Sequence, residues 1–217
     1  MAKQPSHYVI DEMLPDSPTK VDRLSALTDG TYAIVLTLLV IDLKVPEIPG
    51  LAGEPELASD LISQLPNFAA YIVSFIVVAY FWMHHHLLFS SLKRCDQKSL
   101  LLNLVHVLFI TLIPYTTSLI GHYKQDQIAV ALFSANIGLA ALSLILLYLY
   151  FRQKTEWHDG EHPMLWIPTK WWGLYFGPLL AIASIGASFV SIHLSLGIWL
   201  LLPLRNFLLS RWMQQSR

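Results

Sequence analysis

Six apolar runs, separated by charged or proline-containing stretches, take up most of the 217 residues. Each run has about the 20 apolar residues that a helix needs to cross roughly 30 Å of hydrocarbon. The runs are continuous and rich in Leu and Ala rather than alternating, which disfavours the strands of a membrane barrel. We therefore expect transmembrane helices at about 27–43, 68–90, 100–121, 128–151, 171–190 and 193–209.

The composition fits an all-α membrane protein, because 54% of the residues are hydrophobic and only 13% are charged, against about 25% charged residues in soluble domains. Six spans leave no room for a soluble catalytic domain of typical size. We expect a cytosolic N-terminal tail over 1–26 and a six-helix transmembrane domain over 27–217. A net charge of -1 gives no attraction for nucleic acid, and the single Cys95 excludes an intramolecular disulfide.

The positions of the positive charges predict the orientation, because short cytoplasmic loops retain Lys and Arg. All but Lys44 and Lys124 of the 14 lysines and arginines lie before the first span, between the second and third, between the fourth and fifth, or at the C-terminal end. We therefore expect both termini in the cytosol. The acidic stretch after the first span should face outward.

The first span, within RLSALTDGTYAIVLTLLVIDLKVP, carries an acid near its cytosolic end. Ionisable residues at membrane depth often mark function. A simpler interpretation is that Asp29 and Thr28 cap the start of the helix. A second pattern in this span is an apolar stripe of Ile34, Leu38 and Ile41 beside a more polar line through Thr37. Ordinary bundle packing would also explain such a stripe.

Other polar side chains are expected at the depth of Asp29, because the second span ends with three histidines and the third begins with Asn103. Successive helical residues differ by about 100°, so the three histidines cannot all face one partner. Zinc ligands on one helix prefer spacings of three or four, so we expect no metal site and no cofactor. We expect one buried polar cluster that locks the first helix against the next two. Its candidate members are Arg23, Thr28, Asp29, His84, His85 and Asn103.

Two further observations narrow the function. Pro114 should kink the third span, and Thr111, Thr116 or Thr117 could satisfy the freed carbonyls. The sequence contains no phosphate-binding glycine loop, no nucleophile elbow and no helical HExxH, so we expect no enzyme. The filter sequence TVGYG is also absent.

Arg23 and the following LTDGTYAIVLTLLVIDLKVP resemble the Arg and Phe-Ser-Asp signature of the transmembrane protein 175 family, with Leu27 and Thr28 in place of Phe and Ser. FWMHHHLLF at 81–89 resembles the end of the second helix of that family. LLLNLVHVLFITLIPYTTSLIGHY at 100–123 resembles its third helix. The last three spans resemble the family mainly in hydropathy and length.

Members of that family are potassium-permeable channels, endolysosomal in animals, and bacterial members with one six-helix repeat form homotetramers. The resemblance implies a homotetramer whose first helices surround a central pore. It places Ile34 at a hydrophobic gate, Leu38 and Ile41 at the next constrictions, and Thr37 at a position linked to cation selectivity. It also implies that Arg23 and Asp29 join His84 or His85 and Asn103 in a structural cluster.

We therefore expect a potassium-permeable cation channel with a modest preference for potassium over sodium, closed by dewetting at Ile34. Its partners would be further copies of the chain, membrane lipids, potassium and other monovalent cations, in a bacterial plasma membrane. Asp42, nearest the outer end of the pore helix, should enrich cations at the mouth. The main alternative is an ion- or proton-coupled secondary transporter that uses the Arg/Asp/His cluster. A membrane enzyme and a structural subunit are further alternatives.

Overall fold

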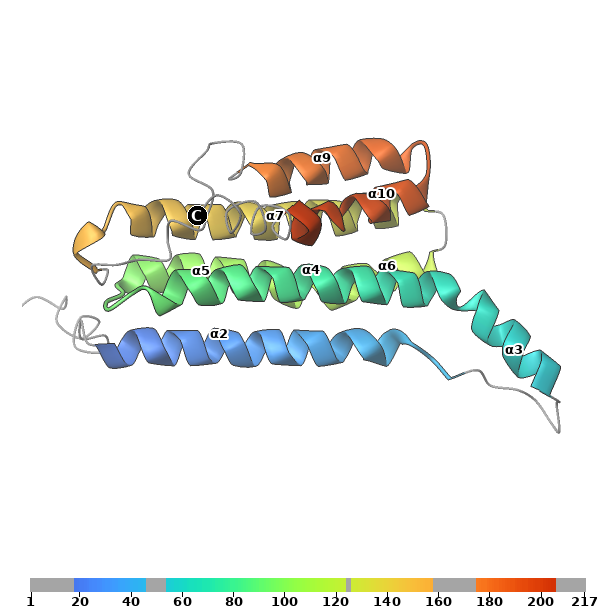
Figure 1. The fold of residues 1–217 in the computed structure, drawn as a ribbon, viewed down its shortest axis with the longest axis horizontal. Coiled ribbons are helices and arrows are strands. Elements are labelled where there is room, and N and C mark those ends of the chain that lie inside the picture. Colours follow the sequence, from blue (N-terminus) through green and yellow to red (C-terminus); the bar gives the residue numbers. More distant parts are fainter. Residues whose placement is uncertain (1–17, 46–53, 124–125, 158–174, 206–217) are drawn as a thin grey trace, which may run out of the picture.

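The computed structural model describes residues 18–45, 54–123, 126–157 and 175–205, and every regular element in these ranges is helical. The chain alternates in direction from one long helix to the next (Figure 1). In chain order the elements are α2 (Pro18–Leu38), η1 (Leu39–Asp42), α3 (Glu54–Ser63), α4 (Leu65–Ser90), α5 (Gln97–Thr111), α6 (Ile113–His122), α7 (Gln127–Arg152), η2 (Thr155–Trp157), α9 (Phe176–Ser188) and α10 (Ile192–Ile198).

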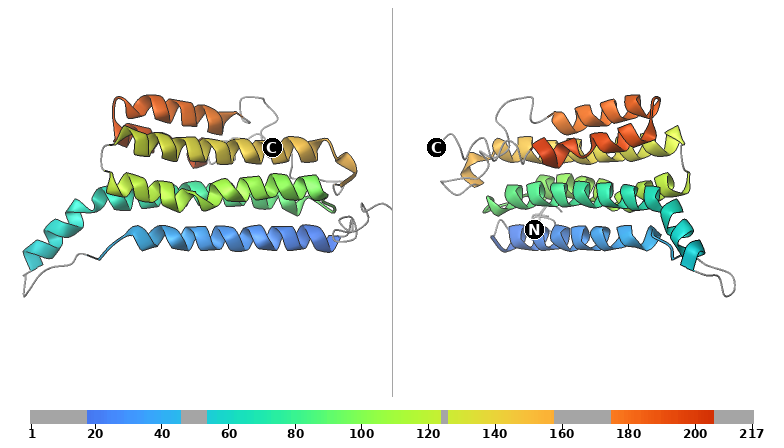
Figure 2. Two further views of the ribbon diagram at one scale, coloured as in Figure 1. Left: turned by 180° about the vertical axis from the view of Figure 1, so that it is seen from behind. Right: turned by 45° about the vertical axis from the view of Figure 1, so that its right-hand side comes forward.

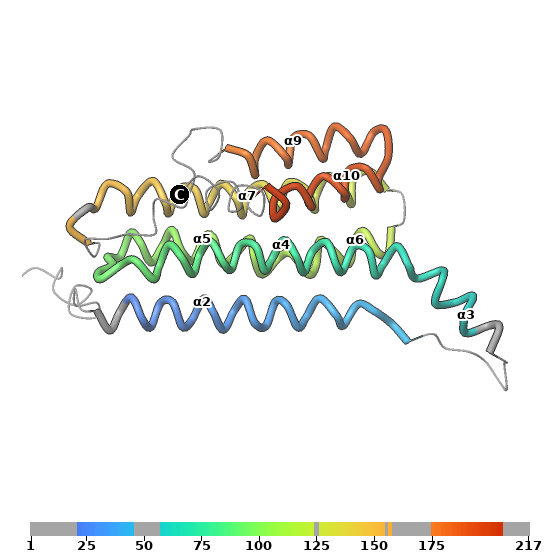
Figure 3. The backbone as a smooth tube through the Cα atoms, viewed as in Figure 1, coloured from blue at the N-terminus to red at the C-terminus, as the bar shows by residue number. Residues whose placement is uncertain are grey.

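The long helices lie side by side along one common axis and stack in three layers, as Figures 1 and 2 show. The outer layer on one side is α2, which packs against α4 and α5. The middle layer holds α4, α5 and α6, and the opposite layer holds α7 with α9 and α10. At one end, α3 leaves the bundle at an angle to α4 (Figure 3). The first helix is thus attached to the bundle along one side only.

Four helical stretches are long and apolar enough to cross a membrane: Val21–Asp42, Leu65–Ser90, Gln97–His122 and Gln127–Arg152. They correspond to the first four expected spans. The first helix begins at Pro18, however, and not near residue 27. Proline is favoured in the first turn of a helix, and the polar first turns need no hydrocarbon around them. Hydropathy therefore located the part of the helix that crosses the membrane and missed the part that extends beyond it.

The last two expected spans, 171–190 and 193–209, are only partly described, and the helix within the first of them is shorter than expected. α9 has 13 residues, which at about 1.5 Å per residue gives about 20 Å of the roughly 30 Å needed. The second of these apolar helical stretches runs from Ile192 to Arg205, with α10 as its first part. Among the described residues the structure thus has four helical stretches of spanning length and two shorter apolar ones, and a total of six spans stays a prediction.

Most positive charges of the described residues lie at the end of the bundle where α2 begins, α4 turns into α5 and α7 ends (Figure 1). Lys93 and Arg94 lie in the turn between α4 and α5, and Lys98 lies in the first turn of α5. Arg152 is the last residue of α7. We refer to this end as the inner end and to the end near α3 as the outer end. The assignment of the inner end to the cytosol remains a prediction.

The turn at the inner end is fixed by Asp96, whose side chain and that of Ser99 form a capping box at the start of α5. The hydroxyl of Tyr150 on α7 also donates to this carboxylate. Partial burial acts to raise the pKa of Asp96, but the hydrogen bonds from Tyr150 and Ser99 and the nearby Lys154 outweigh it and lower the pKa below its ordinary value. The capping carboxylate therefore keeps its charge as the pH falls through the mildly acidic range.

The expected kink at Pro114 is confirmed as an interruption, because α5 ends at Thr111 and α6 begins at Ile113. Proline has no N–H, so carbonyls in the preceding turn lose a helical donor. Thr111 Oγ1 donates to Leu108 O at 2.8 Å and Thr117 Oγ1 donates to Ile113 O at 2.8 Å. The carbonyl that Pro114 leaves without its helical donor is Ile110 O, which accepts from Leu112 N instead, so the expectation that a threonine hydroxyl satisfies it is wrong.

Small residues allow α7 and α9 to approach each other closely. A Cβ atom added to Gly138 would lie 2.6 Å from the Cβ of Ala181, and one added to Gly177 would lie 2.8 Å from the Cβ of Ala141. Close packing through small residues is a main source of helix association in membranes. These glycines therefore hold the shorter α9 against a full-length span.

Gly138→Ala should lower the free energy of unfolding by about 1–2 kcal/mol, because the added methyl group forces the two helices apart. Gly186→Ala is the matched control, since a Cβ there would meet no atom within 4 Å. The thermal unfolding midpoint of the purified protein in detergent measures the difference. Equal midpoints for the two variants would contradict the close approach of α7 and α9.

Candidate functional site

The first helix has two faces of different chemistry. Its buried face repeats every three or four residues and packs on α4 and α5. That face consists of Val21, Leu24, Thr28, Tyr32, Val35 and Leu39. The opposite face is exposed although it is strongly apolar. It includes Leu27, Ile34, Leu38 and Ile41.

The exposed face contains the apolar stripe that the sequence predicted. Ile34 is 59% exposed and Ile41 is 69% exposed, and Leu38 lies between them. Thr37 is also exposed, and its Oγ1 donates to Ile34 O at 2.8 Å. Because that hydrogen is used within the helix, the oxygen lone pairs of Thr37 remain available to water or a cation. The stripe therefore presents apolar side chains and one hydroxyl oxygen to any molecule that contacts this face.

A chain of hydrogen bonds holds the buried face, and each group in it donates to the next. Asn103 Nδ2 on α5 donates to Thr28 Oγ1 at 2.8 Å, and Thr28 Oγ1 donates to Leu24 O at 3.0 Å. The amide oxygen of Asn103 must then accept from His85 Nε2 of α4, at 2.7 Å. Thr28, His85 and Asn103 are fully buried. This first chain joins α2, α4 and α5.

A second chain lies one helical turn further along α2. His106 Nδ1 is 3.2 Å from Ala140 O and 2.9 Å from Ser143 Oγ. A carbonyl only accepts, so Nδ1 carries the hydrogen, and Nε2 accepts from the Tyr32 hydroxyl at 2.7 Å. The chain joins α2, α5 and α7. The rings of His85 and His106 stack at 5.7 Å with 5° between their planes, so the two chains adjoin.

These chains fix the rotation of the first helix. A buried polar group without a partner costs about 1–3 kcal/mol, so α2 loses stability if Thr28 or Tyr32 turns away from its partners. Turning α2 about its axis would also expose Val35 and Leu39. The face that carries Ile34 is therefore presented away from the bundle in one defined orientation.

Three expected members of the polar cluster are outside the hydrogen-bonded chain through Asn103, although Asp29 also joins α2 to α4. The ring of His84 bonds to Tyr80 O within its own helix, at 2.8 Å, so His85 and not His84 reaches Asn103. Asp29 accepts from Trp82 Nε1 at 2.9 Å. Arg23 is exposed, and within the described residues it makes no bond to the cluster. The capping interpretation of Thr28 and Asp29 is wrong, because α2 begins at Pro18 and both residues lie in its interior.

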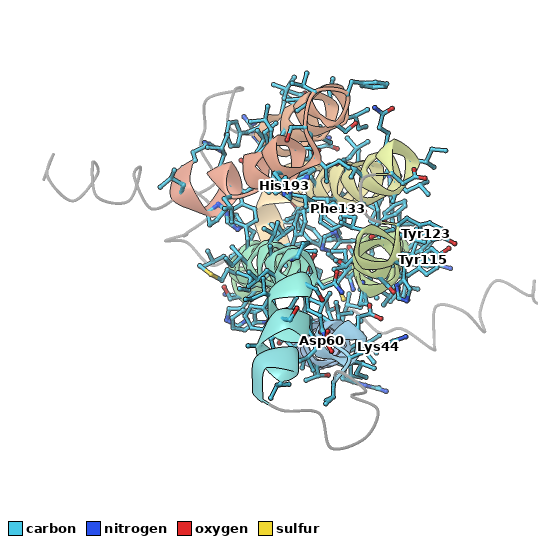
Figure 4. All side chains as sticks on the ribbon, turned by 90° about the vertical axis from the view of Figure 1, so that its right-hand side faces the viewer. Lys44, Asp60, Tyr115, Tyr123, Phe133 and His193 are labelled. Carbon is cyan, nitrogen blue, oxygen red and sulfur yellow. The ribbon has the colours of Figure 1, made fainter. Side chains whose placement is uncertain are left out.

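At the outer end, Asp42 closes the 3-10 turn that continues α2. Ser118 Oγ of α6 donates to Asp42 Oδ1 at 3.1 Å. The outer end of the first helix is therefore tied to α6, just as its inner half is tied to α4, α5 and α7. Figure 4 looks onto this end, with Lys44 near α3 and Phe133 in the middle of the bundle.

The sequence interpretation missed Tyr32, His106, Ser143 and Trp82 as partners. A signal for two of them was present. Tyr32 follows Thr28 by four residues and His106 follows Asn103 by three, which are the spacings of neighbours on one helical face. These two polar pairs on otherwise apolar helices therefore indicate that the two helices contact each other at two successive helical turns.

The comparisons with known proteins agree with this geometry. Residues 23–114 match a family model described as "Endosomal/lysosomal potassium channel TMEM175". A potassium channel of Chryseobacterium sp. (strain P1-3) is 31% identical over 186 residues, which cover 84% of this chain and 90% of the relative. A potassium channel of Streptomyces collinus is 34% identical over 136 residues, which cover 63% of each protein.

A solved structure also resembles the chain over nearly its whole length. It is the crystal structure of a lysosomal potassium-selective channel TMEM175 homolog from Chamaesiphon minutus. The TM-score is 0.73 with 26% sequence identity, and the match covers 87% of this chain and 98% of that one. A match over 87% of the chain therefore extends past the first three expected spans.

Proposed function

The chain belongs to the TMEM175 family, whose members include potassium channels, and on that premise we propose that it is a potassium-permeable cation channel. Membership confirms that the chain is a multi-pass integral membrane protein of an ion-channel family and not an enzyme. Its bacterial relatives make a bacterial plasma membrane the natural location. The proposed channel is a homotetramer in which four copies of α2 line the pore.

The observation that carries this proposal is the exposed apolar face of α2. A single chain leaves Ile34, Leu38 and Ile41 exposed on the side opposite its own core. Four such faces around one axis would make stacked apolar rings, with Ile34 as the narrowest and Leu38 and Ile41 as the next levels. A narrow apolar ring sheds water, and an ion cannot pass without its hydration shell. The channel is therefore closed until the ring at Ile34 widens.

Selectivity is assigned to Thr37 and to the cost of dehydration. The lone pairs of Thr37 can replace part of the water shell of a passing cation, and potassium gives up water more readily than sodium. A ring of neutral hydroxyls discriminates weakly, so the preference for potassium is modest. Asp42 would raise the local concentration of cations at the outer mouth, an effect that salt screens.

The buried chains act as the anchor against which the pore helix moves. In the alternative proposal, a proton-coupled transporter, His85 and His106 would have to gain and lose protons during transport. His106 uses both ring nitrogens in its chain, since Nδ1 donates toward Ala140 O and Nε2 accepts from the Tyr32 hydroxyl, which favours an anchoring role.

Recording from purified protein in planar bilayers under a potassium gradient tests the proposal. A channel gives discrete unitary currents that reverse near the potassium potential. A transporter gives no unitary steps and saturates with its solute. Currents carried by chloride would contradict the proposal, because neither an apolar ring nor threonine hydroxyls favour anions.

Thr37→Val should lower the permeability ratio of potassium to sodium, because valine keeps the shape of threonine and removes the oxygen. The reversal potential under potassium and sodium on opposite sides measures the ratio. Thr111→Val is the matched control, since the exposed Thr111 also donates to the third residue before it, to Leu108 O at 2.8 Å, and lies on α5 away from the stripe. An unchanged ratio in Thr37→Val would remove Thr37 from the selectivity proposal.

A further inference from the structure

A cavity of about 360 Å³ with both polar and apolar walls lies at the outer end, between η1, the start of α4 and the end of α6. Leu39, Leu43 and Ala70 form its apolar part. Asp42 and His122 are the last residues of their spans. Asn67 lies in the first turn of α4. The cavity is therefore at the level of the lipid headgroups.

Asn67 supplies the first unused acceptor. Its Oδ1 is buried and has no hydrogen-bond partner, which is uncommon for a buried polar atom. The atom lies 3.5 Å from the position that a Cβ would take at Gly121. The oxygen packs beside Gly121, so it meets a ligand only when the Asn67 side chain rotates into the cavity that this residue lines.

Asp42 and His122 supply two more acceptors, and Ser118 holds both. Ser118 Oγ donates to Asp42 Oδ1, and among the described residues no group donates to the second carboxylate oxygen. The ring Nδ1 of His122 is 3.0 Å from Ser118 O. A carbonyl only accepts, so Nδ1 carries the hydrogen and Nε2 is left as the acceptor. The cavity thus combines a carboxylate, an amide oxygen and an imidazole nitrogen.

A primary ammonium group matches this set, because it has one positive charge and three N–H donors for three acceptors. Lys44 lines the same cavity, and no described carboxylate lies within ion-pairing distance of it. A bare metal cation would be repelled by Lys44, whereas an anionic group attached to the ammonium would be attracted. The wall therefore suits a zwitterion whose two charges lie a few bonds apart.

We propose that this cavity binds a primary ammonium joined to a phosphate, as in the headgroup of phosphatidylethanolamine or in a free aminoalkyl phosphate. The ammonium donates to Asp42, Asn67 and His122, and the phosphate lies at Lys44. Binding there joins the end of the first helix to α4 and α6. The assignment does not depend on whether the chain conducts ions, but it replaces the role of Asp42 at the pore mouth, because a carboxylate that holds an ammonium no longer enriches cations there.

Native mass spectrometry of the purified full-length protein with equal amounts of phosphatidylethanolamine, phosphatidylcholine and phosphatidylglycerol tests the assignment. Phosphatidylcholine keeps the phosphate and the charge but has no N–H donor. The ethanolamine lipid should be retained about tenfold more than the choline lipid, which is the effect of a lost hydrogen bond to a charged group. Asp42→Asn and Asn67→Ala should each reduce this preference.

Asp60→Asn is the matched control, because Asp60 lies on α3 at the same end and outside the cavity, and it should keep the preference. Gel filtration shows which variants fold. If Asp42→Asn does not fold, the lipid preference of Asn67→Ala decides the test. Displacement of the bound lipid by soluble phosphoethanolamine would favour a free aminoalkyl phosphate, and no displacement would favour the lipid. Equal retention of the ethanolamine and choline lipids, a preference for phosphatidylglycerol, or an unchanged preference in the folded variants would overturn the proposal.

Discussion

Ile34→Asn raises the potassium current at a given voltage by about tenfold or more, with the same reversal potential as the parent protein. Asparagine binds water, so a ring of four asparagines stays hydrated where four isoleucines shed water. A tenfold rise needs a barrier lower by only about 1.4 kcal/mol. Planar-bilayer recordings of the two proteins at equal protein content provide the measurement.

The control for this substitution is Leu139→Asn. Leu139 is also exposed and apolar, but it lies on α7 in the layer opposite α2 (Figure 1). If the increase came from polar substitution as such, both variants would show it. A silent Ile34→Asn protein that folds and inserts normally would refute a gate at Ile34.

The largest expected loss of stability follows Asn103→Leu. The substitution removes the donor to Thr28 and the acceptor of His85, and it leaves the buried Nε2–H of His85 without a partner. An orphaned buried donor together with the lost bonds should cost about 2–3 kcal/mol. The thermal unfolding midpoint in detergent reports this loss.

Thr111→Val serves as the comparison, since Thr111 lies at the end of the same helix and its exposed hydroxyl bonds to Leu108 O within that helix. Its free energy of unfolding should stay within about 0.5 kcal/mol of that of the parent protein. Similar losses in both variants would mean that the interhelical chain through Asn103 contributes little.

The sequence predicted the first four spans because their apolar runs are long and bounded by charge. The fifth expected span is longer than the helix found there, because hydropathy measures composition and not the length of a helix. The pairing of α9 with α7 depends on the close contact of Gly138 with Ala181. That contact joins residues far apart in the chain, and no local pattern shows it.

The polar cluster was predictable in part. Thr28 and Asn103 stood out as polar residues in apolar helices. The choice between His84 and His85 depends on the rotation of α4, which places Val77, Val78 and Phe81 on the buried side together with His85. Because α4 is apolar around nearly its whole circumference, its sequence does not reveal which side is buried.

The separation of α2 into a bonded face and an exposed face bears on how such a protein can change by mutation. Residues on the two faces share no partners, so the effects of substitutions on stability and on conduction should be close to additive. The exposed positions can then vary in size and polarity while Thr28 and Tyr32 keep the helix in place. During evolution the ion selectivity of such a channel could change one residue at a time, without earlier substitutions that compensate for lost stability.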